Sequence, residues 1–137
     1  MLTRSIALSL YQAKVNIKLI PLRSSLKSRI EKPSLIYNVM PEENKRLYRL
    51  LQRNNLNGDY SFLEVCPPDY WRRNKKANKN TGFTTFETDS IPNSWKKSLN
   101  TIKDEIWVPT KFNQYSFHKN GVKTPIFIIP YGFEANI

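Results

Sequence analysis

The sequence contains few of the residues on which common active sites depend: one cysteine, one histidine and four glycines among 137 residues. The single cysteine, Cys66, excludes an intrachain disulfide and is typical of a reducing compartment such as the cytosol. One His and one Cys far apart offer no metal-ligand spacing, so we expect no metal site. No glycine precedes a Lys-Ser/Thr pair, which excludes a Walker-type phosphate loop.

A Cys66–His118 nucleophilic pair is conceivable from residue types alone. However, His118 falls inside an expected helix beside Lys119, and a partly exposed surface histidine is the simpler interpretation. Cys66, at the end of an expected strand, is most simply a small buried hydrophobe.

Long apolar runs are also missing. No run approaches the roughly 18 apolar residues of a membrane span, and no small-residue cleavage site indicates a signal peptide. Acidic residues are scarce: 11 Asp and Glu stand against 22 Lys and Arg, a formal charge of +11. This balance favours a polyanionic partner, such as nucleic acid, an anionic leaflet or a phosphorylated ligand, without choosing among them. A solvated basic surface is the plainer explanation.

The N-terminal part begins with a helical pattern rather than a strand. Ile6, Leu10 and Ala13 form an apolar stripe, and Thr3 or Ser5 could cap that helix. Residues 15–22 alternate in polarity and predict a strand that ends at a proline. A Rossmann-like domain normally begins with a strand and a glycine-rich turn, so either this is an unusual domain or its first strand is missing.

The next segment, residues 23–33, is basic and serine-rich and predicts a loop, and residues 34–40 predict a weak strand. Pro41 suits the first position of a helix, with two Glu in its first turn and Arg49 and Arg53 in its last. Its predicted buried face is Leu47, Leu50 and Leu51. Residues 54–59 predict the stop and turn.

The C-terminal part alternates short apolar runs with helical patterns, which predicts βα units and a parallel sheet. Residues 60–66 predict a strand. Residues 71–80 hold five positive charges and no negative one, and with Tyr70 and Trp71 they resemble a nucleic-acid- or phosphate-binding loop, although a basic, solvated connector is the plainer interpretation. Three later strands are expected, at 83–86, 105–108 and 125–129. The helix between the first two has Trp95, Leu99 and Ile102 on its buried face and is capped by Ser90 or Asn93. The helix between the last two is capped by Thr110 and ends at Gly121.

Polar residues follow the expected strands at their carboxyl ends, where open α/β sheets bind ligands. Glu87, Thr88 and Asp89 follow the run at 83–86, and Thr110 follows the strand at 105–108. Glu87 and Asp89 point to opposite faces if the chain is extended, so they do not form a glycosidase-like pair by spacing. A carboxylate here could accept a hydroxyl hydrogen bond from a substrate, and Asp89 could equally cap the next helix.

Gly132 follows a buried strand and Pro130, and the position predicts a special backbone conformation. The turn at Pro130, Tyr131 and Gly132 is either a simple exit from the sheet or a hinge into a second domain.

Four segments together form an ordered series: Phe86–Pro92, Asp104–Asn113, Phe117–Val122 and Ile128–Glu134. In order and spacing they resemble the end of the N-terminal domain of nucleotide-sugar glycosyltransferases with two Rossmann-like domains (the GT-B architecture). The closest group is the retaining group 1 family, with Thr110 in place of its Ser and Tyr131 in place of its His. The likeness covers about residues 82–134 and extends weakly to residues 4–22.

The resemblance implies an α/β fold: an incomplete Rossmann-like domain over residues 1–132, with a parallel sheet flanked by helices, then the start of an interdomain linker at 133–137. It implies the acceptor side of a glycosyltransferase of hexosyltransferase type, inactive alone because the C-terminal donor domain is absent. The implied substrate cleft is Glu87, Thr88, Asp89 and Thr110, and the implied hinge is Pro130, Tyr131 and Gly132.

The partners implied are a nucleotide-sugar donor, bound through a missing or separate domain, and a saccharide, lipid or protein acceptor, with no cofactor. The expected location is the cytoplasm, with peripheral association at the inner face of the membrane as a further expectation. The alternative interpretation is a small basic module that binds nucleic acid or an anionic surface, based on the charge of +11.

Overall fold

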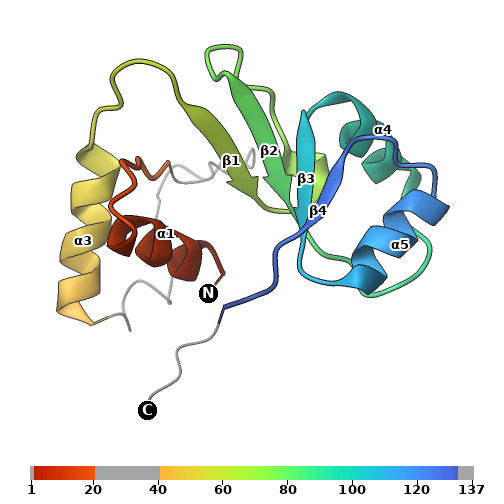
Figure 1. The fold of residues 1–137 in the computed structure, drawn as a ribbon, viewed down its shortest axis with the longest axis horizontal. Helices are drawn as coiled ribbons and strands as arrows, with labels where there is room; N and C mark the ends of the chain where they lie inside the picture. Colours follow the sequence, from red (N-terminus) through yellow and green to blue (C-terminus); the bar gives the residue numbers. More distant parts are fainter. Residues whose placement is uncertain (1, 21–40, 133–137) are drawn as a thin grey trace, which may run out of the picture. The chain divides into compact units, whose positions relative to one another are not determined.

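The computed structural model describes residues 2–20 and 41–132 (Figure 1). The sequence predicted one partial domain over residues 1–132, and the chain divides into two compact units. One is Ile6–Asn57, and the other runs from Gly58 onward and includes the first residues of the first helix.

The N-terminal unit contains the helices α1 (Leu2–Gln12) and α3 (Glu42–Arg53). Helix α1 confirms the predicted helix, but Ala13 of the predicted apolar stripe lies beyond its end and is exposed. The helix begins at Leu2, so Thr3 and Ser5 are inside it and do not cap it. The strand predicted for residues 15–22 is wrong over the part described, since residues 15–20 have no regular structure. Their backbone groups bind the other helix: Leu19 N–H donates to Leu51 O, and the Asn54 amide donates to Ile17 O. The loop and weak strand predicted for 23–40 lie outside the described residues.

Helix α3 begins one residue later than predicted, because Pro41 is its N-cap and not its first residue. Leu51 is buried as expected, but Leu50 is 58% exposed, so its assignment to the buried face is wrong. The helix ends at Asn54 in extended backbone, and Gly58 takes a positive φ of 83° in the turn that follows.

The C-terminal unit confirms the α/β class with a parallel four-stranded sheet. Its strands are β1 (Ser61–Val65), β2 (Lys79–Phe83), β3 (Glu105–Val108) and β4 (Ile126–Ile128), and they lie in the order of the sequence. Strand β2 begins four residues before the predicted run at 83–86, so Thr84–Phe86 belong to the loop after it.

Two helices cover one face of this sheet, α4 (Asn93–Thr101) and α5 (Lys111–Lys119), as Figure 1 shows. Right-handed crossovers between neighbouring parallel strands in sequential order place their helices on the same face. The register aligns Gly82, Ile106 and Ile126 on that face. The core packed there comprises Trp71, Ile91, Trp95, Leu99, Ile106, Val108, Phe117, Val122 and Ile126.

The predicted ends of these helices are partly confirmed. Thr110 caps α5 by accepting a hydrogen bond from Asn113 N–H, and Gly121 has the positive φ of 82° expected after the helix. At α4 the N-cap is Pro92 without a side-chain hydrogen bond, so the predicted caps Ser90 and Asn93 are wrong.

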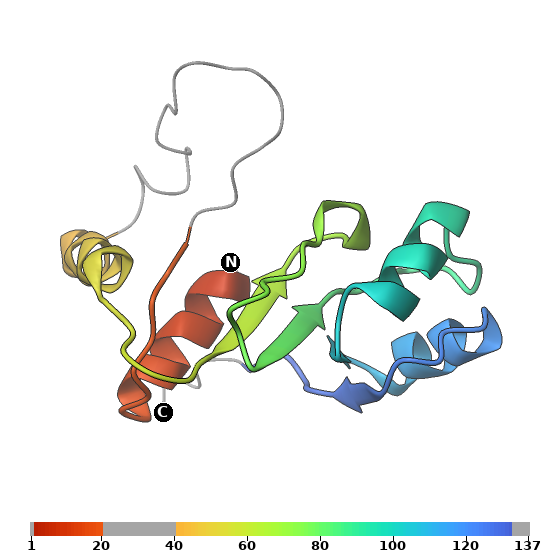
Figure 2. The same ribbon diagram turned by 90° about the horizontal axis from the view of Figure 1, so that it is seen from above.

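The connection between β1 and β2 carries a short 3-10 helix, η1 (Pro68–Tyr70), beside α4 (Figure 2). The basic loop predicted at 71–80 is only partly solvated. Trp71 is 4% exposed and belongs to the core, while Lys79 and Asn80 are already in β2. Trp71 Nε1 donates to Cys66 O at 3.0 Å, which holds the indole over the sheet.

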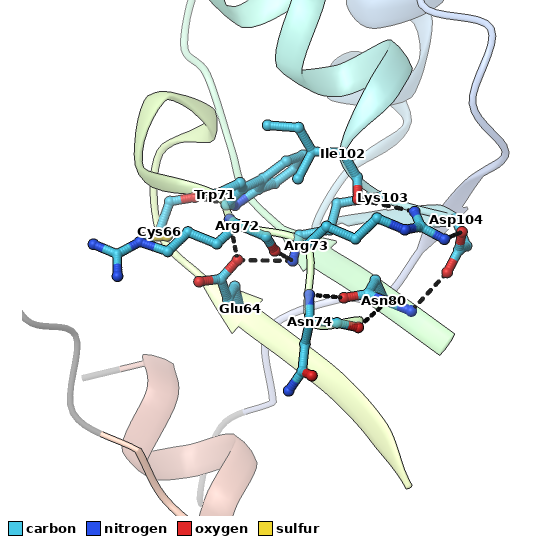
Figure 3. A network of polar contacts seen from close by, with 10 residues as sticks. All are labelled: Glu64, Cys66, Trp71, Arg72, Arg73, Asn74, Asn80, Ile102, Lys103 and Asp104. Atoms are coloured by element: carbon cyan, nitrogen blue, oxygen red, sulfur yellow. Dashed lines mark hydrogen bonds and ion pairs between the residues drawn. The ribbon is translucent and has the colours of Figure 1, made fainter. Parts of the chain in front are cut away.

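A buried ion pair holds the same loop (Figure 3). Lys103 Nζ lies 2.7 Å from Glu64 Oε2, and these side chains are 0% and 8% exposed. The pair is not isolated, because Lys103 also donates to Arg72 O and Glu64 accepts from Arg72 N–H. The Lys103 ammonium also lies 4.9 Å from the Phe62 ring centroid. Such additional partners offset the cost of removing two charges from water.

The neighbouring Asp104 ties the loop to β2. Its carboxylate accepts from Arg73 at 2.7 Å and from Asn80 N–H at 2.8 Å. The hydrogen bond from Asn80 N–H and the one from Arg73 lower the pKa of Asp104. Asn80, 1% exposed, exchanges hydrogen bonds with the backbone of Asn74 (Figure 3). Arg73 is therefore a structural cation.

Candidate functional site

The candidate site is the edge of the sheet where the strands end, together with the loop 84–92 after β2. This loop does not project freely, because it lies along α5 and is bonded to it repeatedly. Three side chains on one face of α5 and at its C-terminal end donate these hydrogen bonds: Asn113, Ser116 and Asn120. Positions separated by three and four residues share one face of a helix.

Asn113 has the most contacts of the three and is 2% exposed. Its amide nitrogen donates to Phe86 O at 2.6 Å, and its amide oxygen accepts from the hydroxyls of Thr85 at 3.2 Å and Thr110 at 2.8 Å. One buried amide thus joins the ends of β2 and β3. It fixes where the loop leaves the sheet.

The predicted site residue Thr110 lies at this edge, but its hydroxyl has two partners already. It accepts from Asn113 N–H at 3.1 Å and donates to the Asn113 amide oxygen. A hydroxyl has one proton to donate and two lone pairs. Thr110 can therefore accept one further hydrogen bond from a ligand, but it has no proton left to donate.

The predicted site residue Asp89 lies at the other end of α5. Its carboxylate is 3.0 Å from Lys119 Nζ, and its carbonyl accepts from the Asn120 amide. The hydrogen bond and charge of Lys119 lower the pKa of Asp89. A nine-residue helix is about 13 Å long, so the structure separates Asp89 from Thr110. Asp89 also does not cap α4, the other interpretation of this residue.

Glu87 and Thr88 lie between these two ends. Thr88 donates its hydroxyl to Ser90 O, and its carbonyl accepts from Ser116. Glu87 is exposed, and among the described residues no hydrogen bond or ion pair holds its carboxylate. Among the four predicted cleft residues, Glu87 therefore offers an unpartnered carboxylate and Thr110 offers one remaining lone pair as acceptors for a ligand hydroxyl.

The predicted hinge follows β4. Pro130, Tyr131 and Gly132 are exposed, and the last sheet bond before them is Ile129 N–H to Val108 O at 2.8 Å. Tyr131 lies 5.9 Å, centroid to centroid, from the Phe83 ring. The positive-φ glycines of the described residues are Gly58 and Gly121, so the special conformation predicted for Gly132 is wrong. Its role as a hinge stays a prediction.

Cys66 has the properties of a packed thiol. Burial and the nearby charge of Glu64 raise the pKa of Cys66 to about 11, so almost no thiolate is present at neutral pH. His118 lies with its Nδ1 3.3 Å from Val122 O. No group of three potential metal ligands occurs within residues 2–20 and 41–132.

Sequence reasoning missed Asn113, Ser116 and Asn120 as organisers of the loop. The signal was present: three short polar side chains at i, i+3 and i+7 on a helix whose other face packs on the sheet. The buried pair Lys103–Glu64 left no such signal, because its partners lie 39 residues apart.

No protein-family model, curated protein or solved structure matches this chain. Within the described parts of the chain, no helix is long and apolar enough to cross a membrane.

Proposed function

We propose that this chain is the acceptor-side domain of a nucleotide-sugar glycosyltransferase of hexosyltransferase type. The observation that supports this most is how the series of family-like segments falls on the fold. Asp104–Asn113 covers β3 and the capped start of α5, Phe117–Val122 covers the end of α5, and Ile128–Gly132 leads out of β4. A parallel sheet with its ligand edge at the carboxyl ends of the strands is compatible with that role.

In this proposal the chain positions the acceptor, and the donor is bound elsewhere. Transfer from a nucleoside diphosphate needs cations and helix N-termini around the leaving diphosphate. We assign that chemistry to a donor domain, either in sequence beyond these residues or on a separate chain. Glu87, held on a loop that α5 fixes, would accept a hydrogen bond from one acceptor hydroxyl, and Thr110 would accept one from a different hydroxyl of the acceptor. The proposed place of action is the cytoplasm, which the single cysteine favours.

The first test is to sequence the transcript that carries this reading frame. We expect a second α/β domain encoded downstream or in an adjacent frame, and a glycine-rich strand–helix start upstream. If neither is found on the transcript or on a co-purifying protein, the proposal is wrong.

The second test is enzymatic. The complete protein, or the reconstituted pair, is incubated with radiolabelled nucleotide sugars and an acceptor panel. We expect Glu87→Gln to lower kcat/KM for the acceptor about ten-fold or more and to leave the donor KM unchanged. Asp59→Asn, an exposed acid in the turn before β1, is the matched control and should leave both unchanged. Equal rates for Glu87→Gln and the control would remove Glu87 from the site.

A second candidate function is supported by the exposed part of the β1–β2 connection. Arg72, Lys75 and Lys76 are exposed, and Tyr70 beside them is 57% exposed. Cations next to an exposed aromatic ring are typical of surfaces that bind single-stranded nucleic acid. Salt-dependent binding of a single-stranded RNA by the purified chain, lost in Lys75→Gln/Lys76→Gln, would support this function.

A further inference from the structure

The sequence contains two Asn-Gly pairs, and the structure places them in opposite surroundings. One is Asn57–Gly58, in the turn after α3, and the other is Asn120–Gly121, at the end of α5. In such a pair the backbone nitrogen of the glycine can attack the side-chain amide carbon of the asparagine, because the glycine has no Cβ to obstruct the approach. The folded structure decides which of the two pairs reaches that geometry.

The pair Asn57–Gly58 is not held in place. Both residues are exposed, and neither belongs to a helix or a strand. Within residues 2–20 and 41–132, no hydrogen bond holds the Asn57 amide or the Gly58 N–H. Gly58 has a φ of 83°, and nothing beyond its chain neighbours lies within 4 Å of a Cβ built on it. The backbone of this turn can therefore rotate toward the reactive geometry without losing a packing contact.

The pair Asn120–Gly121 is held at the atoms that the same reaction would use. The Asn120 amide nitrogen donates to Asp89 O at 2.7 Å and to Ser116 O at 2.8 Å. The Gly121 N–H donates to His118 O at 2.9 Å. The attacking nitrogen and the leaving amide are thus both engaged, so Asn120 reacts only when the end of α5 opens.

We propose that Asn57 is a site of spontaneous deamidation, with water as the only co-reactant. The Gly58 nitrogen forms a bond to Cγ of Asn57, and the Cγ–Nδ2 bond breaks. The proton of the Gly58 N–H leaves with the amide nitrogen as ammonia. Water then opens the succinimide ring at one of its two carbonyls, which leaves aspartate or isoaspartate at position 57.

The products change the chain where the first compact unit ends in the sequence. Either product adds a carboxylate, so the formal charge falls by one from +11. Isoaspartate also carries the main chain through the side-chain carbon, which inserts one extra carbon atom into the backbone. Its free α-carboxylate is a substrate for methyl transfer by an isoaspartyl methyltransferase. The site is independent of the proposed sugar transfer and contains none of its residues.

The test is to age the purified full chain at pH 7 and at pH 8.5, with and without urea, and to map its tryptic peptides by mass spectrometry. In urea we expect Asn57 and Asn120 to convert at rates within about three-fold of each other, because protection by folding is lost. In the native chain Asn57 should keep its rate in urea within about three-fold, and Asn120 should convert at least about ten-fold more slowly. Both conversions should be faster at pH 8.5, since the attacking nitrogen must lose its proton.

Gly58→Ala is the matched variant, and it is compared in urea so that strain at a positive φ has no influence. Conversion of Asn57 should fall about ten-fold, because a Cβ now crowds the attacking nitrogen, and Asn120 should keep its rate. An isoaspartyl methyltransferase with a radiolabelled methyl donor should label the peptide with position 57 in the aged native chain. Equal native rates at Asn57 and Asn120, an unchanged rate in Gly58→Ala, or absence of that label would each overturn the proposal.

Discussion

The indole ring of Trp71 lies against the α-carbon of Gly82. A Cβ built on Gly82 would fall under 3.0 Å from three atoms of that ring, closer than real side chains approach. The absence of a side chain at Gly82 of β2 therefore makes room for the ring of Trp71, which lies in the core with Trp95 and Leu99. This relationship explains why an aromatic residue flanked by a basic loop is buried.

We predict that Gly82→Ala destabilises the protein by about 1–3 kcal/mol or more, because the ring must move or the sheet must bend. Urea unfolding followed by tryptophan fluorescence measures this. Gly132→Ala is the matched control, since nothing lies within 4 Å of a Cβ there and its φ is negative or extended. It should be neutral or slightly stabilising. Equal unfolding free energies for the two variants would contradict the packing of Trp71 on Gly82.

The ion pair of Lys103 and Glu64 gives a second prediction. Lys103→Met leaves a carboxylate 8% exposed without its cation, and we expect a loss of about 3–5 kcal/mol. The double variant Lys103→Met/Glu64→Gln should recover much of this loss, because the Gln oxygen can still accept from Arg72 N–H. A double-mutant cycle from urea unfolding measures the coupling. Additive effects of the two substitutions would show that the charges do not stabilise each other.

The sequence predicted correctly those elements whose ends are marked by residues only a few positions away. Strand β3 was predicted at its observed bounds, and Thr110 and Gly121 were assigned correctly at the two ends of α5. In each case the signal is a cap, a glycine or an apolar run within a few residues. The parallel α/β class followed from the alternation of such elements.

Polarity patterns failed where distant residues satisfy polar groups. Strand β2 was missed at its start because Asn80 and Thr81 are polar but buried, with partners in Asp104 and Glu105. Similarly, residues 15–17 alternate between apolar and polar as a strand would, but the Asn54 amide donates hydrogen bonds to Asn16 Oδ1 and Ile17 O instead. In the candidate site, the sequence predicted that Glu87 follows a strand end. It could not predict that Asn113 holds the neighbouring Phe86, because those two residues are 27 positions apart.

The carboxylate of Asp104 predicts a pH dependence of stability. Its pKa in the folded protein is lowered from 3.8 by the hydrogen bond from Asn80 N–H and by Arg73. Its ionised form is therefore favoured by folding, and this contribution is present above pH 3.8 and is lost as the pH falls through the lower folded value. We expect Asp104→Asn to cost about 0.5–1 kcal/mol at pH 7, since the side chain is one-third exposed.

As the pH falls through the lowered folded pKa of Asp104, the difference between Asp104→Asn and the wild type should shrink toward zero, since both side chains are then neutral. Unfolding free energies measured from pH 2.5 to 7 test this. Asp59→Asn removes the carboxylate of an exposed residue and is the control for the substitution itself, measured over the same range. A difference that stays constant over the whole range would mean that the Asp104 charge contributes nothing.

The last prediction concerns the loop that presents Glu87. Asn113→Ala removes the partner of Phe86 O and of two hydroxyls, and leaves buried groups unsatisfied, so we expect a loss of about 2–3 kcal/mol. Amide hydrogen exchange should rise in residues 84–92 and at the start of α5. Asn120→Ala should raise exchange mainly near Asp89 and Ile91, because those are the residues it binds.

Thr110→Ser is the conservative control for the cap of α5, because serine keeps the hydroxyl that accepts from Asn113 N–H. It should leave exchange in residues 84–92 unchanged, whereas Thr110→Val should cost about 1 kcal/mol and fray the start of α5. Unchanged exchange of the loop in Asn113→Ala would mean that α5 does not hold it in solution. In that case Glu87 would have no fixed position from which to accept a substrate hydroxyl, and the acceptor-site proposal would lose its geometric support.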